Sequence, residues 1–239
     1  MSSLALPKTL GHIWIGPMHP PTVWMDTWKE KHPDWKYTLY DNEFLINRSW
    51  RCQKQILAYY RRGKYEGVAD LMRYEILFDE GGFLPPADST CLHNCEELFD
   101  HPALYSVWEN EEKRPGYLSP FCASVPAHSF LGEILDSLSS LKPWRLKRPW
   151  KSVGNRFLGR FYKEKMPENV TIMPSYTFNP VHLGRGIRYG GTEKVYADQH
   201  WGTTTKAYRN VCEPRSRREM LEVNRHVIKG LADGENGSK

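Results

Sequence analysis

The sequence lacks any apolar run long enough to cross a bilayer, and its N-terminal MSSLALPKTL lacks the apolar segment of a cleaved signal peptide. We therefore expect a cytoplasmic protein with no membrane span. No internal repeat is visible either. A chain of 239 residues with 40% hydrophobic content can bury the core of one domain.

Cysteine is too scarce and too scattered to suggest a disulfide framework. The chain has five cysteines, which are Cys52, Cys91, Cys95, Cys122 and Cys212. An odd number in a chain of this size indicates free thiols in a reducing compartment. The spacing of Cys91 and Cys95 could serve a metal, but no second Cys or Cys/His pair follows at zinc-finger spacing, so no zinc site is expected.

Acidic residues are almost missing between Lys142 and Lys165, where Glu164 is the one acid among interleaved basic and aromatic residues. Such a stretch can bind phosphates or stacked bases. The alternative, which charge runs favour, is a solvated helix face whose aromatic residues belong to the core. The aromatic residues concerned are Trp144, Trp150, Phe157 and Phe161.

Short β-like runs alternate with longer helix-like segments along the chain. The runs that predict strands are residues 10–16, 35–41, 103–110 and 170–175. The segments with helical length and spacing are residues 50–62, 66–79 and 128–141. This alternation predicts an α/β layered fold with a largely parallel sheet. The final ADGENGSK has the composition of a disordered tail.

One predicted helix carries polar residues that could form a site. In GVADLMRYEILFDEGG the apolar residues follow the rhythm of a packed helix face, and Gly81 can supply a left-handed stop. Asp70 and Arg73 lie one turn apart, which by default is a surface ion pair worth a few tenths of a kcal/mol. The alternative is that both converge with Asp88 at the C-terminal end of a short strand, where open α/β sheets place ligands.

Four segments, in order, carry a resemblance to a known family. They are LPKTLGHIWIGP, HPDWKYTLYD, GVADLMRYEILFDEGGFLPPADS and VYADQHWGTT. Together the segments resemble the glycosyltransferases with a DxD sugar-binding region, the family that includes yeast initiating mannosyltransferases and is related to the glucosylating domains of clostridial toxins. The likeness covers roughly residues 6–205.

The resemblance implies a GT-A fold, with a Rossmann-like, mostly parallel sheet flanked by helices. It implies one domain over residues 1–212, with a nucleotide-sugar half at about 1–100 and an acceptor half at about 101–212. A C-terminal helix and disordered tail would occupy residues 213–239. The implied activity is hexosyl transfer from a UDP- or GDP-sugar to a glycan or other acceptor, with Mn²⁺ or Mg²⁺ and with retention of stereochemistry.

The resemblance also implies roles on the donor side. Trp14 falls where the family contacts the nucleotide base, and Asp70 and Arg73 fall where it holds the donor sugar and diphosphate. Asp88 falls on the second acid of the DxD motif, which binds the cation. Without the resemblance, Trp14 would be a core aromatic and Asp88 would cap a turn.

The C-terminal motif implies the remaining roles. His200 and Trp201 lie in a segment that resembles the family's HHW, which closes over metal and diphosphate, with Gln199 in place of the first His. Mn²⁺ tolerates imidazole beside carboxylate, so His200 suits a metal ligand together with the retained acid. The alternative for His200 is a buried ring hydrogen-bonded to backbone. Asn155, at the start of the acceptor half, is an acceptor-site candidate.

The DxD motif has lost its first acid. In the family pattern GGxYxDxD, Pro86 stands where the first Asp is found and Asp88 where the second is found. Proline offers no side-chain acceptor and no backbone donor. Three functions therefore stay open: an active metal-assisted glycosyltransferase, a non-catalytic nucleotide-sugar or glycan-binding module, and a nucleic-acid-binding protein that uses residues 142–165.

Overall fold

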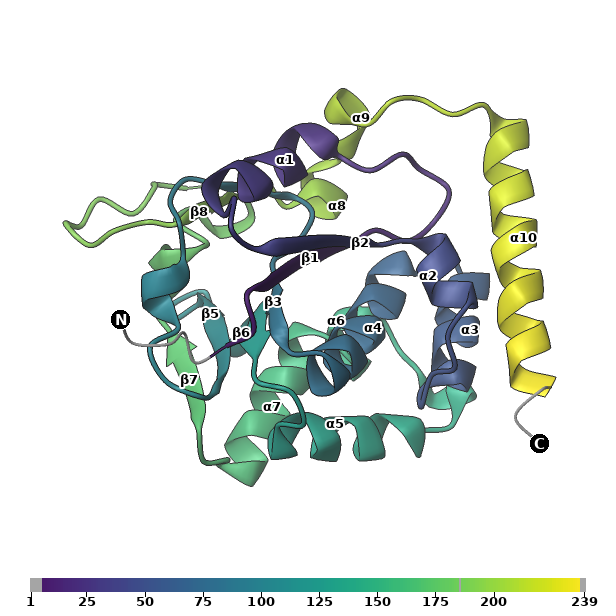
Figure 1. The fold of residues 1–239 in the computed structure, drawn as a ribbon, viewed down its shortest axis with the longest axis horizontal. Coiled ribbons are helices and arrows are strands. Elements are labelled where there is room, and N and C mark those ends of the chain that lie inside the picture. The colour runs from purple at the N-terminus through teal and green to yellow at the C-terminus, as the bar shows by residue number, and fades with distance from the viewer. Residues whose placement is uncertain (1–5, 185, 237–239) are drawn as a thin grey trace.

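A mixed six-stranded sheet forms the centre of the molecule in a computed structural model that describes residues 6–184 and 186–236 (Figure 1). Its strand order is β2-β1-β3-β6-β5-β7. The strands are β1 (Thr9–Ile13), β2 (Lys36–Tyr40), β3 (Gly82–Leu84), β5 (Leu104–Asn110), β6 (Arg114–Ser124) and β7 (Val170–Met173). Two further strands, β4 (Ser89–Cys91) and β8 (Ala197–Gln199), pair antiparallel beside it.

Every pairing in the central sheet is parallel except those of β6 with β3 and β5. The predicted α/β fold with a mostly parallel sheet is therefore confirmed. The sequence did not predict β6. Only a short turn joins β5 to β6, so the two strands pair antiparallel. A parallel pair would need a crossover connection of a dozen residues or more.

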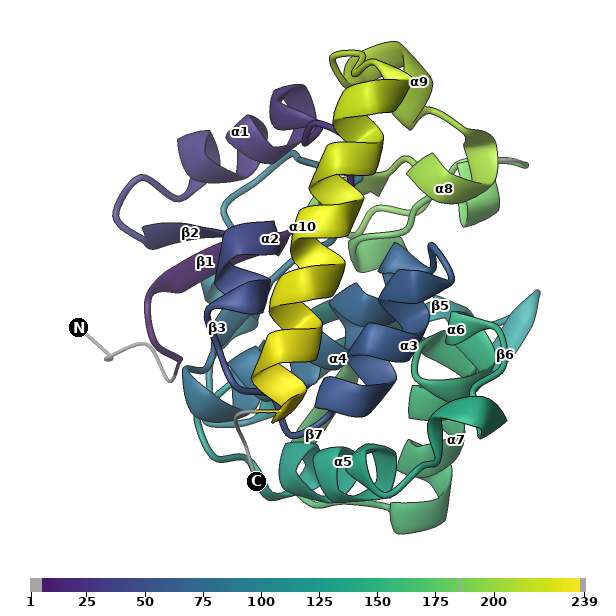
Figure 2. The ribbon, with the colours of Figure 1, turned by 90° about the vertical axis from the view of Figure 1, so that its right-hand side faces the viewer.

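Ten α-helices surround the sheets in the described ranges (Figures 1 and 2). They are α1 (Thr22–Lys31), α2 (Asn42–Ile46), α3 (Gln53–Arg61), α4 (Tyr65–Asp79), α5 (Ser129–Ser139), α6 (Pro149–Ser152), α7 (Asn155–Lys165), α8 (Gly202–Thr205), α9 (Tyr208–Val211) and α10 (Arg217–Asn236). The short 3₁₀ helices are η1 (Glu96–Leu98), η2 (Pro143–Arg145), η3 (Ser175–Thr177) and η4 (His182–Gly184). The three helices predicted from spacing correspond to α3, α4 and α5.

The sheet separates two hydrophobic cores. Successive strand residues point to opposite faces, so Phe83 and Leu84 of β3 belong to different clusters. Phe83 packs in the cluster that contains Trp28 of α1. Leu84 belongs to the larger cluster, to which α3, α4, α5 and α7 contribute. Figure 1 shows α1 on one side of the sheet and α5 and α7 on the other.

The turn between α4 and β3 depends on two glycines. Gly81 has φ +68° and Gly82 has φ +92°, which are conformations that side chains with a Cβ rarely adopt. A Cβ on Gly82 would also lie 1.9 Å from Oγ1 of Thr9. The predicted left-handed stop at Gly81 is therefore confirmed, and β3 can pass close beside β1.

The C-terminal helix extends further than composition predicts. Helix α10 continues through residues 232–236, which the sequence indicated to be disordered, and residues 237–239 lie outside the described residues. Val227 and Leu231 are buried in the larger core, and Gln53 Nε2 donates to the Leu231 carbonyl at 2.7 Å. These contacts stabilise the end of α10 as a helix, although the polar composition of residues 232–236 predicts disorder. In the described ranges no helix is both long and apolar enough to span a membrane.

The basic stretch is only partly a solvated face over core aromatics. Phe157 and Phe161 are buried as expected, and Trp150 is half-buried. Trp144 is 73% exposed, so the expectation that it belongs to the core is wrong. Trp144 lies in η2, the short 3₁₀ helix after α5, and not in a helix that faces the core.

Candidate functional site

Asp70 and Arg73 do not form the helix-surface ion pair that their spacing suggests by default. The Arg73 side chain is buried and its Nη1 donates to the backbone carbonyl of Leu84 at 2.6 Å, at the C-terminal end of β3. Arg73 Nε is buried without a hydrogen-bond partner in the described residues. The guanidinium is therefore fixed against the strand end, with capacity left to bind a ligand.

Asp70 is half-buried, and no residue in the described ranges hydrogen-bonds to its carboxylate. A Cβ at Gly154 would lie 2.7 Å from Asp70 Oδ2, so the junction of α6 and α7 lies directly against this group. Burial raises the pKa of Asp70 to about 7, although the charge of Arg73 opposes the shift. A carboxyl group held in this way is available to a ligand with hydroxyl groups.

Asp88 is held by the C-terminal motif. Its Oδ1 accepts from Gln199 Nε2 at 3.0 Å, and its Oδ2 accepts from the Gly202 backbone N–H at 2.7 Å. The His200 backbone N–H donates to the Asp88 carbonyl at 2.8 Å. The structure therefore brings Asp88 together with a motif more than a hundred residues away. Gln199, which replaces the first His of the family's HHW, donates a hydrogen bond to the Asp88 carboxylate.

Tyr208 also contacts this carboxylate. Its ring lies 5.0 Å from that of Trp14 and 5.9 Å from that of Trp24. A Cβ on Gly202 would lie 2.5 Å from the Tyr208 ring, so a larger residue there would displace the ring. Burial, together with the charge and hydrogen bond of Asp88, raises the pKa of Tyr208 well above its usual range. Tyr208 thus fills the space between Trp14 and Asp88.

The donor types at Asp88 and His200 suit a divalent cation, but their atoms are already engaged. His200 Nε2 lies 2.6 Å from Thr90 Oγ1, and the ring stacks on Trp24 at 4.5 Å. Burial lowers the pKa of His200, which favours the neutral ring that a metal needs. No cluster of three or more His, Cys, Asp or Glu that could hold a metal occurs in residues 6–184 and 186–236. A cation here would need ligands from a bound diphosphate and would have to displace protein donors from Asp88.

Trp14, in the segment after β1, lines a cavity of about 460 Å³ together with residues of β2, α2 and α10. This volume falls within the range of small-molecule sites. The Trp14 indole is half-buried and is fixed by a 2.8 Å bond from Nε1 to the Met18 carbonyl. The polar or charged lining residues are Asp41, Asn42, Glu43, Arg215, Glu222 and His226. Trp14 therefore faces a ligand-sized space and is not a core aromatic.

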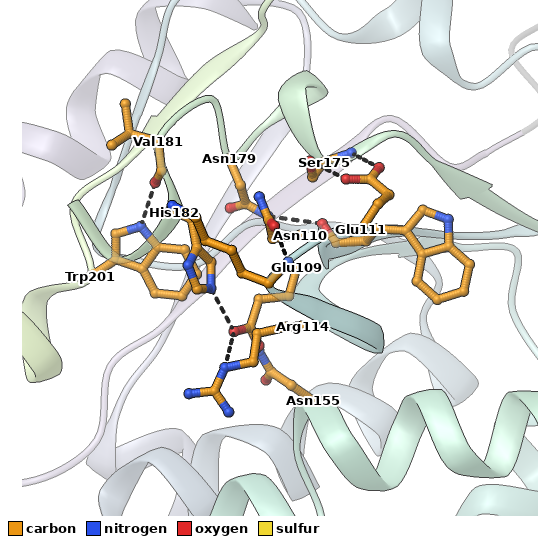
Figure 3. A network of polar contacts seen from close by, with 12 residues as sticks. Glu109, Asn110, Glu111, Arg114, Asn155, Ser175, Asn179, Val181, His182 and Trp201 are labelled. Carbon is orange, nitrogen blue, oxygen red and sulfur yellow. Dashed lines mark hydrogen bonds and ion pairs between the residues drawn. The ribbon is translucent and has the colours of Figure 1, made fainter. Parts of the chain in front are cut away.

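A partly buried polar network links Asn155 to Trp201 (Figure 3). Asn155 Nδ2 donates to Glu109 Oε2 at 2.7 Å, and His182 Nε2 lies 3.3 Å from Glu109 Oε1. The His182 ring packs edge-on against Trp201, whose Nε1 donates to the Val181 carbonyl at 3.0 Å. Figure 3 shows Arg114 beside Glu109, with its Nε 4.0 Å from Glu109 Oε1.

Neither Glu109 nor His182 was predicted as a site residue. Glu109 lies near the end of β5, a strand that the sequence predicted. Its position could have indicated a site residue, because ligands commonly bind at strand ends in open α/β sheets. His182 lies in a segment without periodicity and offers no such signal.

The fold resembles that of the PaToxG glycosyltransferase. The likeness has a TM-score of 0.52 at 17% sequence identity and covers 68% of this chain and 70% of the PaToxG chain. No family model and no curated protein matches the sequence. At this identity the similarity to PaToxG is evidence for the fold.

Contacts in the structure connect the sequence-predicted residues in two groups. Arg73 is joined to the end of β3, with Asp70 one helical turn away. Asp88 is joined to the segment that contains His200 and leads into Trp201. Trp14 reaches this second group through Tyr208, and Asn155 reaches it through Glu109 and His182.

Proposed function

We propose that the chain is a glycosyltransferase that moves a sugar from a nucleotide-sugar donor to a glycan or other acceptor, with metal assistance and retention of stereochemistry. The observation that carries the proposal is the bonding of Asp88 to residues 199–202, next to a strand end that Arg73 binds. The glycosyltransferase-like fold supports it. The proposed organisation is one domain over residues 1–212, followed by α10.

The chemistry of the proposed reaction requires positive charge near the diphosphate. Negative charge builds on the leaving phosphate oxygens as the glycosidic bond breaks, and preorganised donors stabilise it. Arg73 is buried, fixed and partly unpaired, so it can supply that charge without reorganisation. Asp70 would accept from sugar hydroxyls. A cation held by Asp88 and His200 would supply further charge compensation when bound.

The cavity beside Trp14 is the proposed base and ribose site. The acceptor would lie on the side of Asn155, because the α6–α7 junction lies against Asp70 and Asn155 begins α7. Glu109 fixes the amide of Asn155, and His182 connects the same carboxylate to Trp201. Donor and acceptor groups would thus share one rigid network.

A non-catalytic nucleotide-sugar-binding module is the second candidate. Two observations favour it: Pro86 is buried and offers no acceptor, and the Asp88 carboxylate is satisfied by protein donors. A binding module would bind nucleotide sugars without cleaving them, whereas a transferase would release the nucleoside diphosphate.

A thermal-shift screen of nucleoside diphosphates and nucleotide sugars, with and without Mn²⁺, tests whether the site binds a donor. A ligand that binds only the folded state raises the melting temperature, by an amount that follows its affinity. We expect a UDP- or GDP-sugar to raise it, and Mn²⁺ to increase the effect. If no nucleotide raises the melting temperature, both candidates are wrong.

We predict that Tyr208→Phe tightens Mn²⁺ binding in the presence of nucleoside diphosphate by about fivefold. The change removes one of the donors that compete for Asp88, and a hydrogen bond of this kind contributes about 1 kcal/mol. Calorimetry measures the affinity. Tyr105→Phe is the control, since its hydroxyl bonds the His101 carbonyl instead. Unchanged or weaker Mn²⁺ binding by Tyr208→Phe would show that Tyr208 does not block the metal.

We predict that Trp14→Ala weakens nucleoside diphosphate binding about 10- to 100-fold, whereas Trp14→Phe keeps most of the affinity. Stacking of a base on an aromatic ring contributes roughly 1–3 kcal/mol. Fluorescence titration with a labelled nucleotide measures both variants. Trp144→Ala is a matched control because its indole lies outside the cavity. Equal affinities for wild type and Trp14→Ala would place the base elsewhere.

A further inference from the structure

A strongly basic surface surrounds the exposed indole of Trp144. We call it the basic-indole face. Its members are Arg61, Arg62, Lys64, Lys142, Trp144, Arg145, Lys147, Arg148 and Lys151, all of them exposed. They come from the end of α3 and the turn after it, and from the segment that runs from the end of α5 through η2 to α6.

Hydrogen bonds hold the two segments of this face together. Arg62 donates from Nη1 to the Leu146 carbonyl at 3.1 Å and from Nη2 to the Pro143 carbonyl at 3.3 Å. The Tyr59 hydroxyl donates to the Lys147 carbonyl at 3.1 Å. Figure 2 shows the end of α3 beside α6. The charges are therefore presented on a fixed backbone.

The positive charges of the basic-indole face are uncompensated. No ion pair joins any of its eight Lys and Arg side chains to an acid within the part of the chain that the structure describes. In contrast, the neighbouring cations Arg160 and Lys165 pair with Glu164 and Glu133. Like charges gathered without counterions repel one another and favour an anionic partner.

We propose that the basic-indole face docks on an anionic lipid surface. Trp144 is 73% exposed, and an indole with an apolar body and a polar N–H prefers the interface between water and a bilayer. Basic residues around it gain from the negative potential of anionic headgroups. Stable peripheral binding combines burial of apolar surface with electrostatic attraction to anionic lipids. The Trp144 indole would supply the first contribution and the basic residues the second.

The same residues fit a single-stranded nucleic acid less well. Such strands bind along a groove with successive aromatic rings as stacking platforms. The second indole of this region, Trp150, is not free: Lys151 Nζ lies 4.9 Å from its centroid, and Tyr117 stacks with it at 6.1 Å. Only Trp144 projects from the face. A lone indole among dispersed charges favours a lipid surface.

Co-sedimentation with vesicles tests the proposal on the full chain. The wild type is expected to bind phosphatidylcholine vesicles that contain phosphatidylserine, to release them at high NaCl, and to leave pure phosphatidylcholine vesicles unbound. Arg145→Ala/Arg148→Ala should lower the partition coefficient about 25-fold, because each basic residue at an anionic surface contributes a factor of about five. Trp144→Ala should lower it severalfold with the net charge unchanged.

Lys31→Ala/Lys36→Ala is the matched control, because it removes two exposed cations that form no ion pair with the described residues and that belong to α1 and β2, away from this face. It should bind anionic vesicles like the wild type. A loss in the control equal to that of the Arg145/Arg148 variant would show that net charge alone drives binding and would overturn the proposal. So would absence of vesicle binding, or salt-sensitive binding to a poly(U) oligonucleotide under conditions where vesicles do not bind. All variants should keep their nucleotide-dependent thermal shift, so this test is independent of the proposed function.

Discussion

Asp70→Asn is expected to lower sugar transfer about 100-fold and, above neutral pH, to make the protein more stable. The transfer loss follows from removing a carboxylate that would hold the donor sugar in the transition state. The stability gain follows from the burial that raises the pKa of Asp70 to about 7. A residue that costs stability and has no hydrogen-bond partner in the described ranges is typical of a functional site.

The pH dependence of this gain has a defined sign. Because the folded-state pKa of Asp70 lies above that of the unfolded chain, folding becomes less favourable as pH rises from about 4 to 7 and the full penalty applies above 7. Asn carries no charge, so Asp70→Asn should match wild-type stability near pH 4 and exceed it at pH 8 by about 2 kcal/mol. Chemical denaturation at the two pH values measures the difference.

Asp136→Asn serves as a control for Asp70→Asn, because Asp136 is an exposed acid on α5. It should change neither transfer nor the pH profile of stability. Normal transfer by Asp70→Asn would remove Asp70 from the site. Lower stability of Asp70→Asn at pH 8 would mean that its carboxylate is compensated in the folded protein.

Asp88→Asn is expected to lower donor turnover by about 10²- to 10³-fold and to loosen the segment that contains Trp201. An amide presents one acceptor oxygen where the carboxylate presents two, so it cannot accept from Gln199 and from the Gly202 N–H in the same way. The loss of charge also weakens any cation at this position. Turnover assays and hydrogen exchange of residues 199–205 measure the two effects.

The matched control is again Asp136→Asn, because Asp136 is an exposed acid on α5 and no hydrogen bond or ion pair joins it to the candidate site in the described residues. It should leave turnover close to the wild-type value. Wild-type turnover by Asp88→Asn would exclude Asp88 from the chemistry. Faster exchange of residues 199–205 without loss of turnover would assign Asp88 a structural role only.

Local sequence patterns predicted the parts of the fold that depend on neighbouring residues. The apolar rhythm of α4 and the glycines after it fixed the helix, its end at Asp79 and the turn into β3. The same patterns could not predict the antiparallel direction of β6 or the pairing of β4 with β8, because these depend on contacts between distant segments. The helical state of residues 232–236 likewise depends on packing against α2 and α3.

The candidate site was predictable to a similar extent. Asp70, Arg73 and Asp88 stand in motifs, but the sequence could not show that Tyr208 lies between Trp14 and Asp88. Nor could it show that the Asp88 carboxylate is already engaged by the Gln199–Gly202 segment. Both features arise from a chain that returns over the site after more than a hundred residues.

The most direct test of the proposed function is release of nucleoside diphosphate from the nucleotide sugar that gives the largest thermal shift. Wild-type protein and Asp88→Asn are incubated with this donor and Mn²⁺, and the products are separated by ion-exchange chromatography. If the chain is a glycosyltransferase, the wild type should release the diphosphate and free or transferred sugar, and Asp88→Asn should release about 10²- to 10³-fold less. Tight donor binding with no release by the wild type, with or without added glycan acceptors, would contradict catalysis and identify the chain as a binding module.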